Sequence, residues 1–257
     1  VTKLLIDAGE ACQKYHDEHV RGLHCQRIQA DEIWSFYYAK AKNVPENKKG
    51  NAGDIWTWTT LCADSKLICN WVVGGRDAEF AMALMDDLRD RLETRVQLTT
   101  DGHKAYLQAV EGAFGADIDY AMLVKLYGEP ESKTPERKYS PAVCTGTKTT
   151  PIEGDPDPKH VSTSYVERSN LTMRMSMRRF TRLTNAFSKK FSNHCHSLAL
   201  YFVYYNFVRT HKSLRMTPAM AAGVTDKLWE MTDLAEMIDA TQPAPAKRGP
   251  YKKAISN

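Results

Sequence analysis

The segment Ile28-Gln-Ala-Asp-Glu-Ile-Trp-Ser-Phe-Tyr-Tyr-Ala39 is rich in β-branched and aromatic residues, a composition that predicts a β-strand. A loop with several asparagines and lysines follows over residues 40–53, and residues 54–63 then alternate in polarity as a second strand. A tight turn at Asp64-Ser65 leads into a return strand over residues 66–74. Three consecutive strands joined in this way predict an antiparallel meander.

The next segments alternate between helix and strand. Residues 77–93 carry apolar side chains at helical spacing behind a potential N-cap, Asp77. A short strand is expected over residues 96–100, a helix over 103–114 and a strand over 118–126. The order βββαβαβ predicts an α/β fold with a mixed five-stranded sheet, three antiparallel strands followed by two strands that alternate with helices.

The flanking segments differ from this central pattern. We expect residues 1–27 to form a helical segment, either the end of a truncated helix-turn-helix or a helix packed on the domain, with a further piece upstream of Val1. Residues 129–160 contain six prolines and are expected to be an irregular insertion. Helices resume near residue 163 and again over 187–209, which completes a central domain over residues 28–223. Residues 224–257 are expected to add a helix and a basic disordered tail.

Composition excludes several classes of protein. The 257 residues contain no apolar run long enough to cross a membrane, and the six cysteines include no C-x-x-C pair for a zinc ribbon. We expect reduced thiols and a cytoplasmic location. The net charge of +4 is unevenly distributed: residues 168–190 hold seven basic residues and no acid, whereas 77–93 is mostly acidic. This asymmetry predicts one face for a polyanion and another for solvent.

Three acidic residues lie where chemistry on a phosphodiester would need them. Asp31 lies within the first strand, Asp101 follows the fourth strand, and Glu167 begins the basic helix. In a βββαβ sheet the first strand can lie beside the fourth, so Asp31 and Asp101 are expected to share a metal ion while Glu167 completes the site. Two Mg²⁺ ions held by carboxylates can activate the attacking oxygen and stabilise the leaving one.

Glu32 is excluded from this set by strand geometry. Adjacent strand residues point to opposite faces, so only one of Asp31 and Glu32 is expected to enter the site. Asp31 is preferred because its same-face neighbours Ile33 and Ser35 are smaller than Trp34 and Phe36.

Each acid has a simpler explanation when taken alone. An acid at a strand end commonly forms a turn, and an acid at a helix start commonly interacts with the helix dipole. The three acids together, ahead of an acid-free basic helix, favour the catalytic interpretation. His103 and Lys104, directly after the Asp101 turn, are candidates for phosphate contact, although a solvent-exposed helix start explains them equally well.

Four blocks of sequence resemble the DDE transposases of bacterial insertion sequences, most nearly those of the insertion-sequence-one type. They are Gln29-Ala-Asp-Glu-Ile-Trp, Thr100-Asp-Gly-His-Lys-Ala-Tyr, Ser162-Thr-Ser-Tyr-Val-Glu-Arg-Ser-Asn-Leu-Thr-Met-Arg, and Tyr204-Tyr-Asn-Phe-Val-Arg-Thr-His-Lys-Ser-Leu-Arg-Met-Thr-Pro-Ala. The blocks extend over about residues 28–223. Two features depart from the family: the interval from Asp101 to Glu167 is longer than usual, and the zinc-binding and helix-turn-helix parts are missing from this segment.

The resemblance implies a ribonuclease-H-like fold with flanking helices, a catalytic Asp31-Asp101-Glu167 triad, and two Mg²⁺ or Mn²⁺ ions bound by the same three residues. It also implies double-stranded DNA partners, both transposon ends and target, a homodimer or higher oligomer, and a location at the bacterial nucleoid. Arg174, seven residues after Glu167, matches the position of a lysine or arginine that binds a terminal phosphate in the family. The other residues expected to bind the DNA backbone are Arg168, Arg178, Arg179 and Arg182.

Two further functions remain open from sequence. A ribonuclease-H-like nuclease or Holliday-junction resolvase would use the same acids to cut DNA without joining it. An inactive DNA-binding remnant of a transposable element would retain the basic helix but not the chemistry, and the presence of all three acids argues against it.

Overall fold

The computed structural model describes residues 2–128, 144–181 and 185–241. Its strands are β1 (Arg27–Tyr37), β2 (Gly53–Cys62), β3 (Ile68–Gly74), β4 (Gln97–Thr100), β5 (Asp119–Tyr127) and β6 (Cys144–Glu153). Its α-helices are α1 (Thr2–His19), α2 (Ala78–Arg91), α3 (Ala105–Phe114), α4 (Ser164–Ser176), α5 (Phe191–Val203), α6 (Pro218–Ala221) and α7 (Met231–Ala240). Of the expected C-terminal helix and tail over residues 224–257, residues 242–257 lie outside the described residues.

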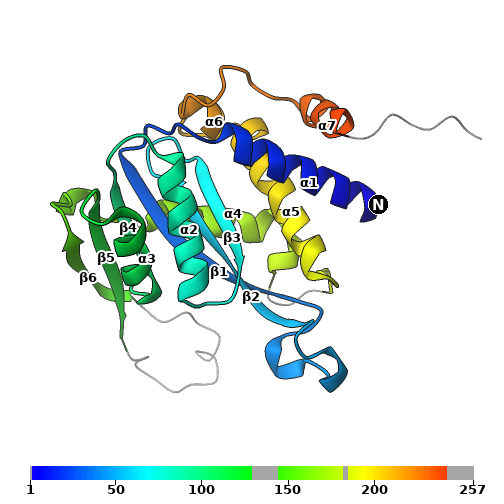
Figure 1. Cartoon of the computed structure of the whole chain (residues 1–257), viewed down its shortest axis with the longest axis horizontal. Helices are drawn as coiled ribbons and strands as arrows, with labels where there is room; N and C mark the ends of the chain where they lie inside the picture. Colours follow the sequence, from blue (N-terminus) through cyan, green and yellow to red (C-terminus); the bar gives the residue numbers. More distant parts are fainter. Residues whose placement is uncertain (1, 129–143, 182–184, 242–257) are drawn as a thin grey trace, which may run out of the picture.

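The strands form one mixed sheet in the order β3-β2-β1-β4-β5-β6 (Figure 1). β1, β2 and β3 are antiparallel neighbours, as the meander prediction required, and β4 and β5 run parallel to β1. This topology is compatible with the ribonuclease-H-like expectation.

The expected number of strands was wrong because of the segment before α4. Residues 144–153, predicted to be part of an irregular insertion, form β6 and pair antiparallel with β5 at the edge of the sheet. β6 is almost entirely exposed and contains Pro151, so it lacks the apolar alternation by which a strand is recognised. Its backbone pairing, rather than side-chain burial, holds it in place. Residues 129–143 of the expected insertion lie outside the described residues.

Helices cover both faces of the sheet, and alternation along β1 directs its side chains to both. Ile28 and Ala30 pack in a core cluster with α2 and α3, in front of the sheet in Figure 1. Ile33 packs in a second cluster with Val166 of α4 and Phe202 of α5, on the opposite face. The same alternation directs the polar members of β1 to both faces.

Of two predicted helices, one matches its expected extent and the other does not. α2 begins at its expected cap, where the Asp77 carboxylate accepts a hydrogen bond from the backbone N–H of Glu79 at 3.1 Å. The helix predicted over residues 187–209 starts later, at Phe191, and ends in a π-helical turn, η6 (Tyr204–Val208). The π turn carries the Asn206 side chain inward, where it bonds both backbone groups of Ile68 on β3.

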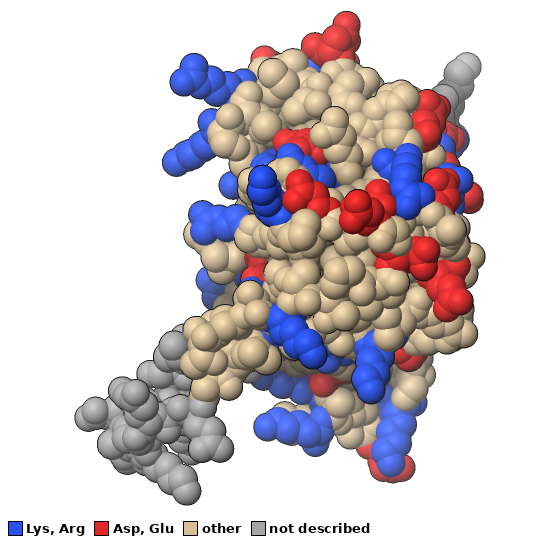
Figure 2. All heavy atoms as spheres, turned by 90° about the vertical axis from the view of Figure 1, so that its left-hand side faces the viewer, with Lys and Arg blue, Asp and Glu red and all other residues tan. Residues whose placement is uncertain are grey.

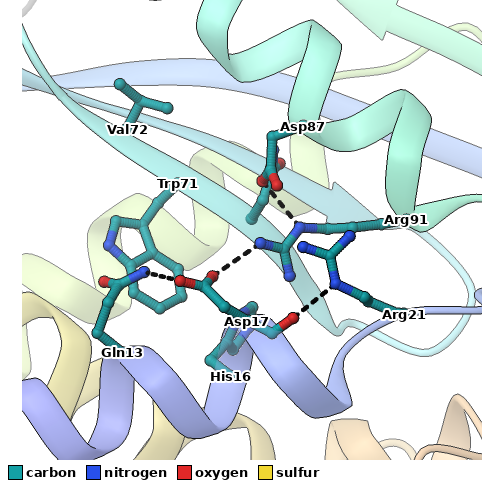
Figure 3. A pocket seen from close by; sticks show the side chains of 9 residues that line it. Gln13, His16, Asp17, Arg21, Trp71, Val72, Asp87 and Arg91 are labelled. Carbon is teal, nitrogen blue, oxygen red and sulfur yellow. Dashed lines mark hydrogen bonds and ion pairs between the residues drawn. The ribbon is translucent and has the colours of Figure 1, made fainter.

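The N-terminal helix packs on the domain. Arg91 of α2, only 3% exposed, donates hydrogen bonds to Asp17 of α1 and to Asp87 (Figure 3). It also donates to the Val20 carbonyl. A buried guanidinium with three acceptors is well satisfied, and it ties α1 to α2 beside the β3 edge. Within the described residues, no helix is long and apolar enough to cross a membrane.

The crossing of α1 and α5 depends on a glycine. A Cβ on Gly9 would lie 2.3 Å from the Cβ of His196, so Gly9→Ala should force the two helices apart and lower the free energy of unfolding by about 1–3 kcal/mol. Gly112 in α3 is the matched control, because a Cβ there meets no atom within 4 Å; Gly112→Ala should raise stability by about 0.5–1 kcal/mol. Urea unfolding measures both, and equal shifts in the two variants would contradict this packing.

Candidate active site

The parallel pairing of β1 with β4 brings two acidic residues together. Ala30 pairs with Thr100, so Asp31 and Asp101 are the next residue along each chain. β4 ends at Thr100, and the Asp101 carboxylate accepts a hydrogen bond from the backbone N–H of His103 at 2.9 Å. The predicted proximity of Asp31 and Asp101 is therefore present in the structure.

Glu32 joins this pair, contrary to the prediction that it faces away. Each of Asp31, Glu32 and Asp101 has a carboxylate oxygen within 4.8 Å of the others. Asp31 and Glu32 do point to opposite faces, since Asp31 bonds Asn170 of α4 and Glu32 bonds Tyr106 of α3. Because β4 ends beside them, Asp101 is reached from both faces of the sheet. Strand alternation is thus retained, but the exclusion drawn from it was wrong.

Side chains that the sequence did not single out hold these carboxylates. The Asn170 amide donates to Asp31 at 2.8 Å, and Asn170 follows Glu167 by three positions, a spacing that keeps both on one helix face. Arg76 pairs with Glu32 at 2.6 Å and Tyr106 donates to it at 3.3 Å, leaving the Glu32 side chain 2% exposed. Only the helical spacing of Asn170 was a signal available from sequence.

The electrostatics of the cluster favour a bound cation. Burial, and then repulsion from Glu32 and Asp101, raise the pKa of Asp31 to about 7. Burial and the Asp101 charge also raise the pKa of Glu32. Hard carboxylate oxygens are the ligands that Mg²⁺ and Mn²⁺ prefer, and a divalent cation would relieve the mutual repulsion. The donor set therefore fits the metal that sequence predicted.

Glu167 lines the same cavity, of ≈ 540 Å³, as Asp31 and Asp101. It lies in the first turn of α4, where it accepts a hydrogen bond from Thr163 at 2.6 Å and forms an ion pair with Lys125 of β5. Among the described residues, the tight acidic cluster does not include Glu167. The structure thus brings Glu167 to the cavity wall, with Lys125 as its partner.

The predicted DNA-binding residues divide between several surroundings. His103 lines the carboxylate cavity, and Lys104 precedes the first turn of α3. Arg168 lines a different cavity, and Arg178 is exposed after α4. Arg174 donates to the Phe180 carbonyl at 3.5 Å, and half-buried Arg179 donates to Ser188 at 2.6 Å. Arg182 lies outside the described residues.

Charge is divided between opposite sides of the molecule. Figure 2 shows most Lys and Arg toward the left and lower edges of the face at the β6 end, and most Asp and Glu toward the right. The division follows the helices, since α2 carries Glu79, Asp86, Asp87 and Asp90. An anionic polymer would accordingly be attracted to the α4 side.

Comparisons with known proteins return distant structural similarities. No family model and no curated protein matches the chain. One similar solved structure is a simian T-cell lymphotropic virus intasome in complex with PP2A regulatory subunit B56 gamma, with 12% identity, a TM-score of 0.43, and coverage of 92% of this chain and 62% of that one.

Two other solved structures are also similar to this chain. A piggyBac transposase synaptic complex with hairpin DNA shows 11% identity and a TM-score of 0.32, over 86% of this chain and 55% of that one. Endonuclease V from Bacillus subtilis shows 14% identity and a TM-score of 0.22, over 47% and 55%. The chain spans 55% to 62% of the length of these three chains.

The clustered carboxylates predict a pH-dependent stability. Folding raises the pKa of Asp31 from 3.8 to about 7, so its favourable contribution is present below pH 3.8 and is lost as pH rises through about 7. Without divalent metal, Asp31→Asn should therefore unfold at a higher temperature than the unaltered protein at about pH 8, with a difference that shrinks toward about pH 4.

Calorimetry measures this difference, with Asp86→Asn on the exposed surface of α2 as the control. Mg²⁺ should raise the unfolding temperature of the unaltered protein more than that of Asp31→Asn, because the native state alone presents the assembled site. A pH-independent difference between the two proteins would contradict the electrostatic account.

Proposed function

We propose that this chain is the catalytic part of a DNA transposase that cleaves and joins phosphodiesters at insertion-sequence ends with divalent metal. The observation that carries the proposal is the convergence of Asp31 and Asp101, from adjacent parallel strands, with Glu167 on the wall of the same cavity. The four sequence blocks that resemble DDE transposases include all three residues, which supports assigning them the catalytic roles.

Asp31, Asp101 and Glu32 would hold the metal. Glu167 would join them when its ion pair with Lys125 is replaced by a contact with the metal. The resemblance implies two ions of Mg²⁺ or Mn²⁺. When bound, such ions supply positive charge near the attacking and leaving oxygens of an in-line displacement at phosphorus. Water is the attacking group in cleavage, and a 3′-hydroxyl of DNA is the attacking group in joining.

The surrounding residues have roles that follow from their contacts. Asn170 and Tyr106 orient the carboxylates of Asp31 and Glu32, and Arg76 balances the charge of Glu32. His103 and Lys125 border the cavity and are positioned to contact the phosphate. We further propose residues 28–223 as the catalytic domain and a homodimer or larger assembly on paired double-stranded DNA ends.

Removal of a metal-binding carboxylate should abolish the reaction. Asp101→Ala should reduce Mg²⁺-dependent cleavage by more than the roughly 10–100-fold expected for a supporting residue such as Asn170→Ala. Glu167→Gln should also lose activity and require more Mg²⁺. Asp86→Ala, which removes an exposed acid from α2, is the control and should retain activity.

The decisive assay supplies pre-cleaved end DNA and a target plasmid, and measures joined products by gel electrophoresis. Joined products that require Mg²⁺ and Asp101 support the transposase. Cleavage without joining would assign the protein to the nucleases or resolvases instead. DNA binding with no cleavage in either Mg²⁺ or Mn²⁺ would contradict both enzymatic functions.

A further inference from the structure

A second cavity, of ≈ 440 Å³, lies against a different side of α4 from the carboxylate cavity. Arg168 and Thr172 of α4 line it, together with Lys66 from the β2–β3 turn and the segment that follows η6. Glu167 and Arg168 are consecutive residues, yet Glu167 lines the carboxylate cavity and Arg168 lines the second one. One helix therefore forms a wall of both cavities.

The second cavity is strongly basic. Lys66, Arg168, Arg209 and Lys212 line it, and no aspartate or glutamate does. None of these four cations forms an ion pair with a carboxylate in the described part of the chain, whereas many other basic residues do. Burial, and then the charges of Lys66 and Arg209, lower the pKa of His211, which also lines the cavity. Such uncompensated positive charge is suited to an anionic ligand.

Local backbone structure fixes the positions of these cations. Arg209 directly follows the π-helical turn, and its N–H bonds the Tyr204 carbonyl at 2.9 Å. A backbone bridge between His211 and Met216 closes the loop that presents Lys212. Lys66 adopts a left-handed backbone conformation with φ of 62°, and its ammonium lies over the ring of Tyr165. Such a conformation is common in the turn of a β-hairpin, and the turn thereby sets where this lysine begins.

We propose that this cavity binds the backbone phosphates of a DNA strand that crosses α4 from the carboxylate cavity. The inference rests on the proposed function, because the shared wall would let one strand reach both cavities. Arginine forks match phosphate oxygens, and lysine adds a point charge. This subsite extends the DNA contact beyond the residues assigned from sequence to Lys66, Arg209 and Lys212.

The test measures DNA binding in EDTA by fluorescence anisotropy over a range of salt concentrations, with duplex and single-stranded DNA of equal length. Lys212→Gln and Arg209→Gln should each weaken binding and flatten the plot of log K against log salt by about 0.9 for a duplex, or about 0.7 for a single strand. Lys212→Arg keeps the charge and should bind like the unaltered protein. Lys3→Gln removes an exposed charge from α1, outside the cavity, and is the matched control.

The outcomes separate this subsite from the catalytic proposal. Asp101→Ala removes a negative charge beside the proposed strand and should bind DNA in EDTA at least as tightly as the unaltered protein does, whatever the outcome of the cleavage assay. The inference is overturned if Lys212→Gln and Lys3→Gln have equal salt slopes, or if the unaltered protein does not bind DNA. It is also overturned if inorganic phosphate or a mononucleotide occupies the cavity while DNA binding is insensitive to Lys212 and Arg209. Thermal unfolding of each variant verifies that the fold is intact.

Discussion

The parallel pairing of β1 with β4 is the constraint on which the site depends. It sets Ala30 opposite Thr100, and thereby directs two carboxylates toward one point. Burying like charges together is unfavourable, as the raised pKa of Asp31 indicates. The Asn170 amide donates to Asp31 and Arg76 pairs with Glu32, and both contacts lower the repulsion between the carboxylates. The repulsion that remains would be relieved by a bound cation.

The placement of α4 joins the proposed chemistry to the proposed binding. Its buried face packs Val166 and Met173 against the sheet, which fixes Glu167 at one cavity and Arg168 at the other. The acidic helix α2 lies on the other face of the sheet from α4. A polyanion would therefore be attracted to the α4 side, where the carboxylate cavity opens. Under the two proposals, these neighbouring residues of one helix would make two distinct contacts with a phosphate-bearing ligand.

Sequence predicted the features that arise from local periodicity. Alternation in residues 54–63 and helical spacing in 77–93 reproduce β2 and α2 closely, and the strand order made Asp31 and Asp101 neighbours. Features set by distant partners were missed. β6 is exposed and polar, so only its pairing with β5 defines it. Glu32 was excluded because alternation alone does not reveal where the neighbouring strand ends, and the Lys125–Glu167 ion pair joins residues with no shared local pattern.

The most direct test of the account is the anomalous scattering of Mn²⁺ in crystals of the protein. The account predicts a peak at bonding distance from the carboxylates of both Asp31 and Asp101, and its loss in Asp101→Ala. Saturating Mn²⁺ that leaves these carboxylates without a peak, or that binds only at other residues, would contradict the claim that the sheet assembles a metal centre there.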